Sequence, residues 1–368
     1  KETIDYIVSL LADPKKILGV IEEELKKIKE KYEDPRRTKV YKSRVDEFSE
    51  EDLIQNEPTV ITLTQTGYIK RQSLASFRTQ ARGGKGIRGM TTKEEDIIDK
   101  ILYAETHDFI LFFTNLGKVY QTRVFEMEEA SRISKGTAIV NLIDITQGET
   151  IQSILTYNPK EKDRLKNIVM ATEKGVIKKT KVDEFANIRR GGIIAIKLDS
   201  NDSLQWVNSS SGEDDIVMIT QSGKIINFPE SHVRATGRSS QGVRGIRLVK
   251  DDLVVGMDVV SKKDKEVKLL IVAENGLGKR TRVSEVRNQR RGGQGVRIAN
   301  INAKTGKIVF ASVLEAGVTE VIITSEKGQV VKIPIGSTPL LSRNAQGVIL
   351  MRFSDKNDKV AAATTVSP

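Results

Sequence analysis

The first 40 residues follow a helical pattern of apolar and polar positions. Apolar side chains recur every three or four residues, which is the spacing of a helix that packs on a partner helix. They are Ile4, Ile7, Leu11, Leu18, Ile21, Leu25, Ile28 and Tyr32. Asp13 followed by Pro14 is typical of a helix N-cap and first turn, so we predict a second helix that starts there and ends near Pro35. Its apolar stripe would be covered either by a partner helix from outside this segment or by the domain that follows.

From about residue 41 the pattern changes to short apolar runs that are broken by glycine. Six units follow one another, each with an apolar run, a polar pair or triplet, a glycine and a second run. We call these the hairpin glycines: Gly67, Gly117, Gly175, Gly223, Gly276 and Gly328. Because glycine adopts positive φ without a steric penalty, as tight turns between paired strands require, each unit is predicted to form a β-hairpin.

A further glycine follows each hairpin glycine, by 19 residues or, in the third unit, by 17. These second glycines are Gly86, Gly136, Gly192, Gly242, Gly295 and Gly347. The hairpin glycines lie 48 to 58 residues apart, and four short strands per repeat of about 50 residues is typical of a propeller blade. We therefore predict an all-β, six-bladed, propeller-like domain over residues 41–368, preceded by a helical segment and linker over residues 1–40. A solenoid, the alternative, would need atypical capping repeats.

Basic residues outnumber acidic ones, with 60 Lys and Arg against 49 Asp and Glu and a net charge of +11. The first 40 residues hold 10 basic and 9 acidic side chains, so the excess lies in the repeats. An excess of this kind favours a polyanionic partner such as nucleic acid.

Two places in the repeat carry this positive charge. The first lies three and four residues after the hairpin glycine, where units one, three and five have Lys70-Arg71, Lys178-Lys179 and Lys279-Arg280. The second surrounds the second glycine and includes Arg78, Arg82, Lys85, Arg88, Arg132, Lys135, Arg189, Arg190, Arg234, Arg238, Arg244, Arg287, Arg290, Arg291 and Arg343. Equivalent positions of successive blades fall on the same part of a disc, so we predict a basic belt suited to a long polyanion. The alternative is ordinary solvated surface charge, but this does not explain why the basic residues recur at equivalent positions of successive units.

One glycine-rich segment stands out within the second cluster: Gln80, Ala81, Arg82, Gly83, Gly84, Lys85 and Gly86. Its glycines let backbone amides approach phosphates closely, and its cations supply charge. Residues 289–295 and 189–192 are variants of it in units five and three. Residues 84–89 also match G-x-G-x-x-G, but they belong to a β repeat and lack the strand-to-helix setting of a dinucleotide site. The chain has no Walker A sequence.

Composition excludes several kinds of chemistry. The chain has no cysteine and only two histidines, His107 and His232, so thiolate metal sites are excluded, and a histidine cluster or a serine triad would depend on one isolated imidazole. No apolar run approaches the length of a membrane span, and the absence of disulfides favours the cytoplasm. The chain begins at Lys1 rather than Met, which we take as the mark of a fragment of a longer protein.

The sequence resembles the carboxy-terminal DNA-wrapping domains of DNA gyrase A subunits, preceded by the last helical segment of the amino-terminal part. The resemblance covers essentially the whole chain, including the helix and KYEDPRRT around residues 20–38, the GYIKR hairpin, ETHDFILFFTNLGKVY and EASR followed by KGTAIVNL. Residues 80–86 match the family's gyrase A box, usually Q-R-R-G-G-K-G, from which Ala81 departs at the second position.

The resemblance implies a six-bladed β-pinwheel whose basic rim wraps double-stranded DNA. The implied DNA-binding residues are Gln80, Ala81, Arg82, Gly83, Gly84, Lys85 and Gly86 of the box, with Lys70, Arg71, Arg78, Arg88, Lys178, Lys179, Arg189, Arg190, Lys279, Arg280, Arg290 and Arg291 on the rim. It also implies partners, namely the remainder of the gyrase A subunit together with the gyrase B subunit in an A2B2 enzyme, and a place with the bacterial nucleoid. This fragment would hold no cofactor and no catalytic residue, since ATP, Mg²⁺ and the cleaving tyrosine belong to other parts of the enzyme.

Other functions stay open at this point. The corresponding domain from the A subunit of topoisomerase IV would bend DNA without supercoiling it, although six regular units and the box favour gyrase. A propeller used as a protein-interaction scaffold would direct its positive charge at an acidic partner. An enzyme with a central-channel active site would need convergent acids and histidines, whereas the repeats offer mostly Ile, Val and Thr.

Overall fold

The computed structural model describes residues 1–33, 54–64, 66–73, 98–131, 134–158, 165–186, 188–189, 191–264, 266–314, 317–355 and 357–366. The chain divides into two compact units, Lys1–Leu53 and Ile54–Pro368. The boundary predicted between residues 40 and 41 lies outside the described residues.

The first unit contains two helices, α1 (Glu2–Leu11) and α2 (Pro14–Tyr32). The Asp13 side chain accepts a hydrogen bond from the backbone N–H of Lys15 at 3.0 Å, and Pro14 occupies the first helical position. The predicted start and end of the second helix are therefore confirmed. No residue of either helix is buried, so the apolar stripe is exposed along both helices.

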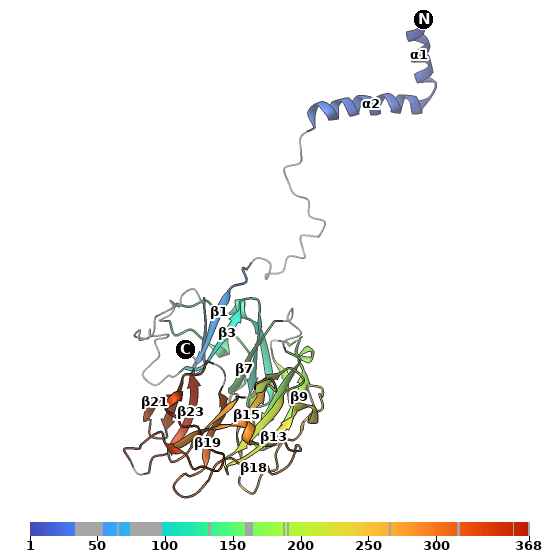
Figure 1. The fold of residues 1–368 in the computed structure, drawn as a ribbon. Helices are drawn as coiled ribbons and strands as arrows, with labels where there is room; N and C mark the ends of the chain where they lie inside the picture. The colour runs from blue at the N-terminus through green and yellow to red at the C-terminus, as the bar shows by residue number, and fades with distance from the viewer. Residues whose placement is uncertain are drawn as a thin grey trace. The chain divides into compact units, whose positions relative to one another are not determined.

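The second unit consists of six antiparallel sheets, the blades, which we number in chain order (Figure 1). Blade one contains β1 (Pro58–Thr64), β2 (Tyr68–Ser73), β3 (Ile98–Glu105) and β6 (Thr137–Ala138), and blade two contains β4 (Phe109–Thr114), β5 (Lys118–Arg123), β7 (Ile151–Tyr157) and β10 (Ile193–Ile194). Blade three contains β8 (Asn167–Thr172), β9 (Val176–Lys181), β11 (Leu204–Ser210) and β14 (Val243–Arg244). Blade four contains β12 (Asp215–Thr220), β13 (Lys224–Pro229), β15 (Val254–Val260) and β18 (Val296–Arg297). Blade five contains β16 (Lys268–Ala273), β17 (Leu277–Arg282), β19 (Ile308–Leu314) and β22 (Val348–Ile349). Blade six, as described, contains β20 (Glu320–Ser325), β21 (Val330–Pro334) and β23 (Val360–Val366).

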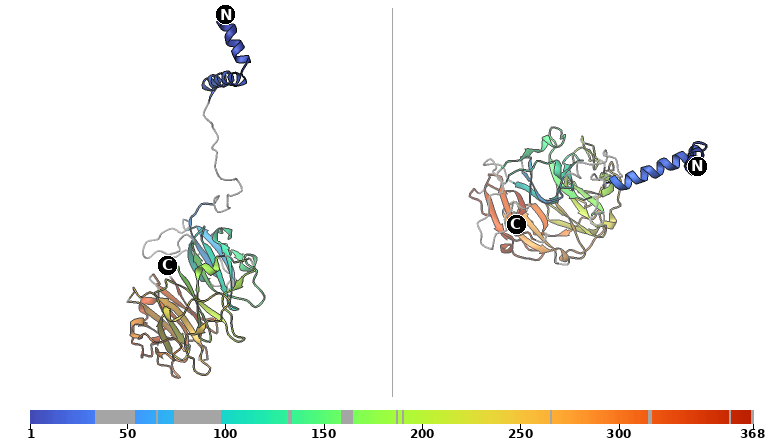
Figure 2. Two further views of the ribbon diagram at one scale, coloured as in Figure 1. Left: turned by 90° about the vertical axis from the view of Figure 1, so that its right-hand side faces the viewer. Right: turned by 90° about the horizontal axis from the view of Figure 1, so that it is seen from above.

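The hairpins form as predicted. All six hairpin glycines have positive φ, between 74° and 83°, and each connects the first two strands of its unit, as in the pairing of β12 with β13. The strands β3, β7, β11, β15, β19 and β23 contact one another in chain order and form the inner wall. Seen from above in Figure 2, the chain runs around the ring from blue-green through yellow to red.

The fourth strand of a blade comes from the next unit along the chain, which differs from the expectation that each unit supplies all four strands of its blade. Each two-residue edge strand directly follows a second glycine, so β14 follows Gly242 of unit four yet pairs with β9 of blade three. The edge strands β6, β10, β14, β18 and β22 therefore lie at the outer margin of blades one to five and tie each blade to the next unit.

Between β5 and the edge strand β6, and at the equivalent place in the later units, the chain makes a short 3-10 turn. These turns are η3 (Val124–Glu126), η5 (Val182–Phe185), η6 (Glu230–His232), η7 (Val283–Glu285) and η8 (Ile335–Ser337), and a further turn, η4 (Ile139–Asn141), follows β6. In each of these units, the edge loop is the segment that runs from the 3-10 turn before the edge strand (η3, η5, η6, η7 or η8) to the second glycine.

The apolar core lies between neighbouring blades. In β12, Ile216 and Met218 pack into the cluster shared with blade three, whereas Val217 and Ile219 pack into the cluster shared with blade five. Successive residues of a strand point to opposite faces of the sheet, so both faces of this strand are buried. This explains why the central strands appear in the sequence as continuous apolar runs rather than alternating ones.

Candidate nucleic-acid interface

The lysines three residues after the hairpin glycine are buried, which corrects their assignment to an exposed basic rim. Lys70, Lys178 and Lys279 are each 1% exposed, and Lys179, one position further on, is 7% exposed. They lie on the second strand of the hairpin, and in blades three and five both faces of the sheet are covered by neighbouring blades. A phosphate in solution cannot reach an ammonium group placed there.

These buried lysines bind backbone carbonyls of the next unit's edge loop. Lys279 Nζ donates to the carbonyls of Ser342 and Arg343 at 2.8 and 2.9 Å, and Lys70 Nζ donates to Ser134 at 3.0 Å. Lys178 Nζ donates to the carbonyl of Arg238 in the next unit's edge loop, and also to that of Ala195, just after the edge strand of its own unit, at 2.7 Å. Burial lowers the pKa of Lys178 and of Lys279 to about 8, because desolvation disfavours the charged form.

The residue four positions after the hairpin glycine has an equivalent structural role. In units one to five its side chain donates a hydrogen bond to a carbonyl in or just after the next unit's 3-10 turn. The pairs are Arg71 with Met127 at 3.1 Å, Gln121 with Phe185 at 3.4 Å, Lys179 with Glu230 at 2.9 Å, Asn227 with Val286 at 3.4 Å and Arg280 with Thr338 at 2.7 Å. The residue types differ, but all five carry a side-chain N–H of sufficient reach. Arg71 and Arg280, assigned to the rim from sequence, are therefore half-buried connections between blades.

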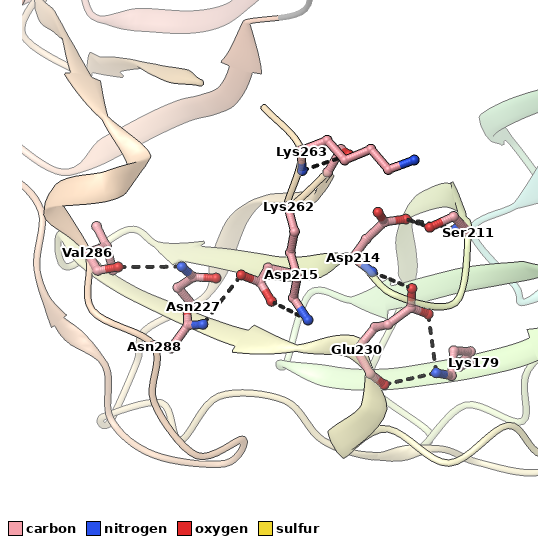
Figure 3. Close-up of polar contacts among 11 residues, drawn as sticks. Lys179, Ser211, Asp214, Asp215, Asn227, Glu230, Lys262, Lys263, Val286 and Asn288 are labelled. Carbon is pink, nitrogen blue, oxygen red and sulfur yellow. Dashed lines mark hydrogen bonds and ion pairs between the residues drawn. The ribbon is translucent and has the colours of Figure 1, made fainter. Parts of the chain in front are cut away.

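Figure 3 shows this connection between blades three and four. The buried Glu230 carboxylate receives Lys179 Nζ at 3.2 Å and the backbone N–H of Asp214 at 2.9 Å, and Ser210 donates to it at 2.8 Å. A buried ion pair of this kind is satisfied internally and leaves no charge free for a ligand. Lys262 and Asp215, 3.6 Å apart, form a more exposed pair nearby.

The described members of the second basic cluster lie at the outer margin, on the edge loops and edge strands. Residues 80–86 of the box, with Arg78, Arg88, Arg132 and Arg190, lie outside the described residues. Arg189 and Arg290 are exposed and Arg291 is half-buried. Lys135 and Arg238 are engaged within the protein, the first over the ring of Tyr68 at 3.5 Å and the second 3.9 Å from Glu184.

Hydrogen bonds join the successive edge segments of units three to six into one continuous band. The backbone N–H of Lys197 donates to Ser240 at 3.1 Å, that of Gly292 to Gly245 at 2.7 Å and that of Arg247 to Gly293 at 2.8 Å. Arg343 Nη1 then donates to the carbonyl of Arg297 at 3.1 Å. The edge segments of units three to six, which the sequence predicts to lie in register, are therefore neighbours in the structure.

The second glycines permit this close crossing over the preceding blade. Gly192, with φ of +71°, lies against Tyr120, and an added Cβ would come within 2.6 Å of a ring carbon. Gly295, with φ of +74°, would bring a Cβ within 2.5 Å of the carbonyl oxygen of Ile225. The repeated second glycine therefore reflects both a backbone angle and an absence of space.

Exposed charge is unevenly distributed over the described edge. The edge segments of units four and five expose six arginines, Arg234, Arg244, Arg247, Arg287, Arg290 and Arg297, whereas unit two exposes Glu126 at the end of its 3-10 turn and Glu128 and Glu129 after it. Arg247 and Arg297 were missed from sequence. The place two residues after the second glycine, shared by Arg88, Arg244 and Arg297, would have pointed to one of them.

No other described feature competes with this edge as a functional site. Among the described residues there is no group of histidine and acidic side chains that could hold a metal ion, and no described helix is long and apolar enough to cross a bilayer. A hollow of about 290 Å³ is lined by residues that include Tyr103, Glu105, Asp108, Tyr157 and Ser209, with no lysine, arginine or histidine among the described residues around it.

The fold and this edge define a class of protein: a propeller whose outermost strands are exchanged between neighbouring units and whose margin presents arginines in register. The model of a family described as the DNA gyrase C-terminal domain, β-propeller, matches residues 58–104, 108–158, 166–211, 214–261, 268–315 and 319–367. The chain belongs to this family, which confirms the resemblance found in the sequence.

Full-length relatives and solved domains agree with this. The chain is 38% identical over 357 residues to the DNA gyrase A subunit of Staphylococcus epidermidis and, equally, to that of Staphylococcus aureus, covering 96% of this chain and 40% of each relative. It thus spans well under half the length of these relatives. A solved DNA gyrase A C-terminal domain matches with a TM-score of 0.62 and 27% identity, over 84% of this chain and 99% of that one. The C-terminal domain of DNA topoisomerase IV matches with a TM-score of 0.73 and 24% identity, over 85% and 94%, and shows the shared fold.

Proposed function

We propose that this chain binds, bends and chirally wraps double-stranded DNA around its outer margin, as the C-terminal part of a gyrase A subunit. The observation that carries the proposal is the band of hydrogen-bonded edge segments that holds exposed arginines at fixed intervals over units four and five. Guanidinium groups remain charged at every physiological pH and match phosphate geometry. An extended row of them suits a long polyanion better than it suits a small ligand.

The path of the DNA follows from the distribution of charge. The duplex would run over the edge of units four and five and avoid the carboxylates of Glu126, Glu128 and Glu129 on unit two. The contacts would be mostly to phosphates, so sequence preference would be weak and would come from the ease of bending. The box at residues 80–86, which lies outside the described residues, would extend this path on the first unit.

The energies are compatible with wrapping. Bending about 40 base pairs through half a turn costs on the order of 10 kcal/mol by elastic scaling. Neutralising about eight phosphates releases enough counterions to offset this cost at moderate salt, and the same contacts make binding fall steeply as salt rises.

The chain would act within a larger enzyme. In that enzyme, ATP and Mg²⁺ would be bound and DNA would be cut by parts outside this chain, and the partners would be the remainder of the A subunit together with a B subunit. Wrapping of one hand would present a neighbouring duplex to the enzyme so that strand passage lowers the linking number. This chain itself would supply binding and geometry rather than catalysis.

The proposal can be tested by comparing short and long duplexes that carry a fluorophore at each end. We expect the chain to prefer duplexes of about 100 base pairs over those of about 20, to bring the two ends together, and to lose about 10⁴ in affinity between about 50 and 200 mM salt. An interaction scaffold that recognises only charge would show neither the length preference nor the approach of the ends.

A further inference from the structure

Edge-loop arginines of two neighbouring units make the same contact. Arg291 lies four residues before the second glycine of unit five, and its Nη1 donates to the carbonyl of Arg244 at 2.5 Å. Arg343 lies four residues before the second glycine of unit six, and its Nη1 donates to the carbonyl of Arg297 at 3.1 Å. In both cases the acceptor is the second residue of the preceding unit's edge strand, β14 or β18.

The Arg291 guanidinium bridges two parts of unit four. Besides the carbonyl of Arg244 on β14, its Nε donates to the carbonyl of His232 in η6 at 3.1 Å. Because a guanidinium presents several donors in a rigid fork, one side chain can fix both segments. Turning Arg291 outward to a phosphate would leave both carbonyls without these donors.

The backbone around Arg291 is fixed by the same crossing. The N–H of Gly292 donates to Gly245 at 2.7 Å and the N–H of Arg247 donates to Gly293 at 2.8 Å. The edge loop of unit five is therefore attached to the edge segment of unit four both through the Arg291 side chain and through the two residues that follow it.

Arg290, the adjacent residue, has a different environment. Its side chain is exposed and has no hydrogen-bond or ion-pair partner among the described residues. The same holds for the side chains of Arg244 and Arg297 in the part of the edge that is described, although their carbonyls are the acceptors of the contacts above. Three guanidinium groups are thus free while the backbone that carries them is held in place.

We propose a division of labour among these residues, which rests on the proposed function. Arg244, Arg290 and Arg297 contact DNA phosphates, and Arg291 and Arg343 are positioning residues that hold the edge backbone in the register those contacts need. Charge and geometry are supplied by different arginines, so two adjacent residues of one motif have separate effects when each is changed.

The test compares Arg290→Ala with Arg291→Ala and Arg291→Lys in the 368-residue chain. Affinity for a duplex of about 100 base pairs is measured across a salt series, and amide hydrogen exchange of residues 244–250 and 289–297 is measured without DNA. We expect Arg290→Ala to reduce the slope of log affinity against log salt by about 1 and to leave exchange unchanged. We expect both Arg291 variants to accelerate exchange of the Gly292 and Arg247 amides, and Arg291→Lys, which keeps the charge, to keep the full salt slope.

Each opposite result overturns a named part of the proposal. Loss of one unit of salt slope in Arg291→Ala with protection intact would make Arg291 a phosphate contact rather than a positioning residue. An unchanged slope in Arg290→Ala would remove Arg290 from the DNA contacts, and faster exchange in that variant would make it a structural residue.

The two arms also separate this inference from the proposed function. If the unmodified chain shows no salt-dependent binding to the duplex, the proposed function and the DNA contacts fail together. The exchange arm uses no DNA and still decides whether Arg291 holds the edge loop. If Arg291→Ala does not fold, Arg291→Lys provides the same comparison with the side chain largely retained.

Discussion

The two basic clusters of the repeat look alike in sequence and have opposite environments in the structure. Lysines three residues after the hairpin glycine are buried and bind carbonyls of the next unit, whereas arginines near the second glycine lie at the outer margin. Both recur in register, so register alone indicates a shared structural environment and not exposure. What separates them is the strand on which each lies: the hairpin strand is covered on both faces, and the edge segment has a free side.

The comparison also explains the choice of cation. Burial removes water from an ammonium group and disfavours its charged form, as the lowered pKa of Lys178 and Lys279 indicates. Lysine suits the inner position because it can lose its proton there. Arginine keeps its charge in every environment, which suits a contact with phosphate.

The largest effect is expected at a glycine of the edge. Changing Gly192 to Ala places a Cβ within 2.6 Å of the ring of Tyr120, at a positive φ. That ring is fully buried and its hydroxyl is held by Glu149 at 2.9 Å, so it cannot yield. We expect the free energy of unfolding to fall by about 3–5 kcal/mol, measured by urea denaturation.

Gly191 is the matched control, since nothing lies within 4 Å of a Cβ added there. Gly191→Ala should change the free energy of unfolding by about 0.5 kcal/mol or less. Equal losses in the two variants would mean that the crossing over Tyr120 is not the constraint.

Removal of an inner lysine should have the next largest effect. Lys279→Ala leaves the carbonyls of Ser342 and Arg343 without their donor and opens a cavity, so we expect a loss of about 2–4 kcal/mol in urea denaturation. Lys307→Ala, at an exposed lysine, should be close to neutral. If Lys279→Ala were as mild as Lys307→Ala, the two clusters would not differ in role as described.

Stability at alkaline pH should depend on the inner lysines. The pKa of Lys178 and of Lys279 is about 8 in the folded chain and near 10.4 when unfolded, so between these values the unfolded chain binds more protons and stability rises with pH. From pH 8 to about 9.5 we expect a gain of about 1–2 kcal/mol for each of the two lysines.

Urea denaturation at several pH values checks this, with a Lys178→Met, Lys279→Met double variant as the control that should lose the rise. DNA affinity over the same range should stay constant, because the arginines of the edge do not titrate there. A DNA affinity that falls along with lysine deprotonation would place the inner lysines among the DNA contacts.

The smallest effect concerns the box. Ala81 stands five residues before its second glycine, as Arg290 does in unit five. If the free cation of the motif occupies this place, Ala81→Arg should strengthen binding to a duplex of about 100 base pairs by up to about 1 kcal/mol and add about 1 to the salt slope. A salt titration of the variant against the unmodified chain measures the affinity and the salt slope. An unchanged slope would mean that position 81 is not equivalent to Arg290 of unit five.

Much of the fold could be predicted from sequence because glycine at positive φ leaves a periodic trace. The hairpins, the six units and the start of α2 at Asp13-Pro14 all follow from local chemistry that a single sequence displays. The exchange of edge strands could not be predicted, because a two-residue strand such as Val243–Arg244 has no pattern of its own and its partner lies in another unit.

The candidate site was predicted less well than the fold. Lysine is usually found at the surface, and nothing near Lys178 in the sequence shows that its strand is covered on both faces. Arg290 and Arg291 are adjacent and chemically identical, so only the position of the Arg244 carbonyl distinguishes them. The burial of Lys279 is likewise a property of the neighbouring blade rather than of its own unit.

The most direct test of the account is topological. Nicked circular DNA is ligated with increasing amounts of the chain, the protein is removed and the linking-number distribution is read. The same is done with Arg244→Ala, Arg290→Ala, Arg297→Ala combined and with a control of equal charge loss at the exposed lysines, Lys250→Ala, Lys304→Ala, Lys307→Ala combined. We predict a shift toward positive linking difference with the unmodified chain and the lysine control, and its loss in the arginine variant. Tight binding by the unmodified chain with no shift, or an undiminished shift in the arginine variant, would contradict it.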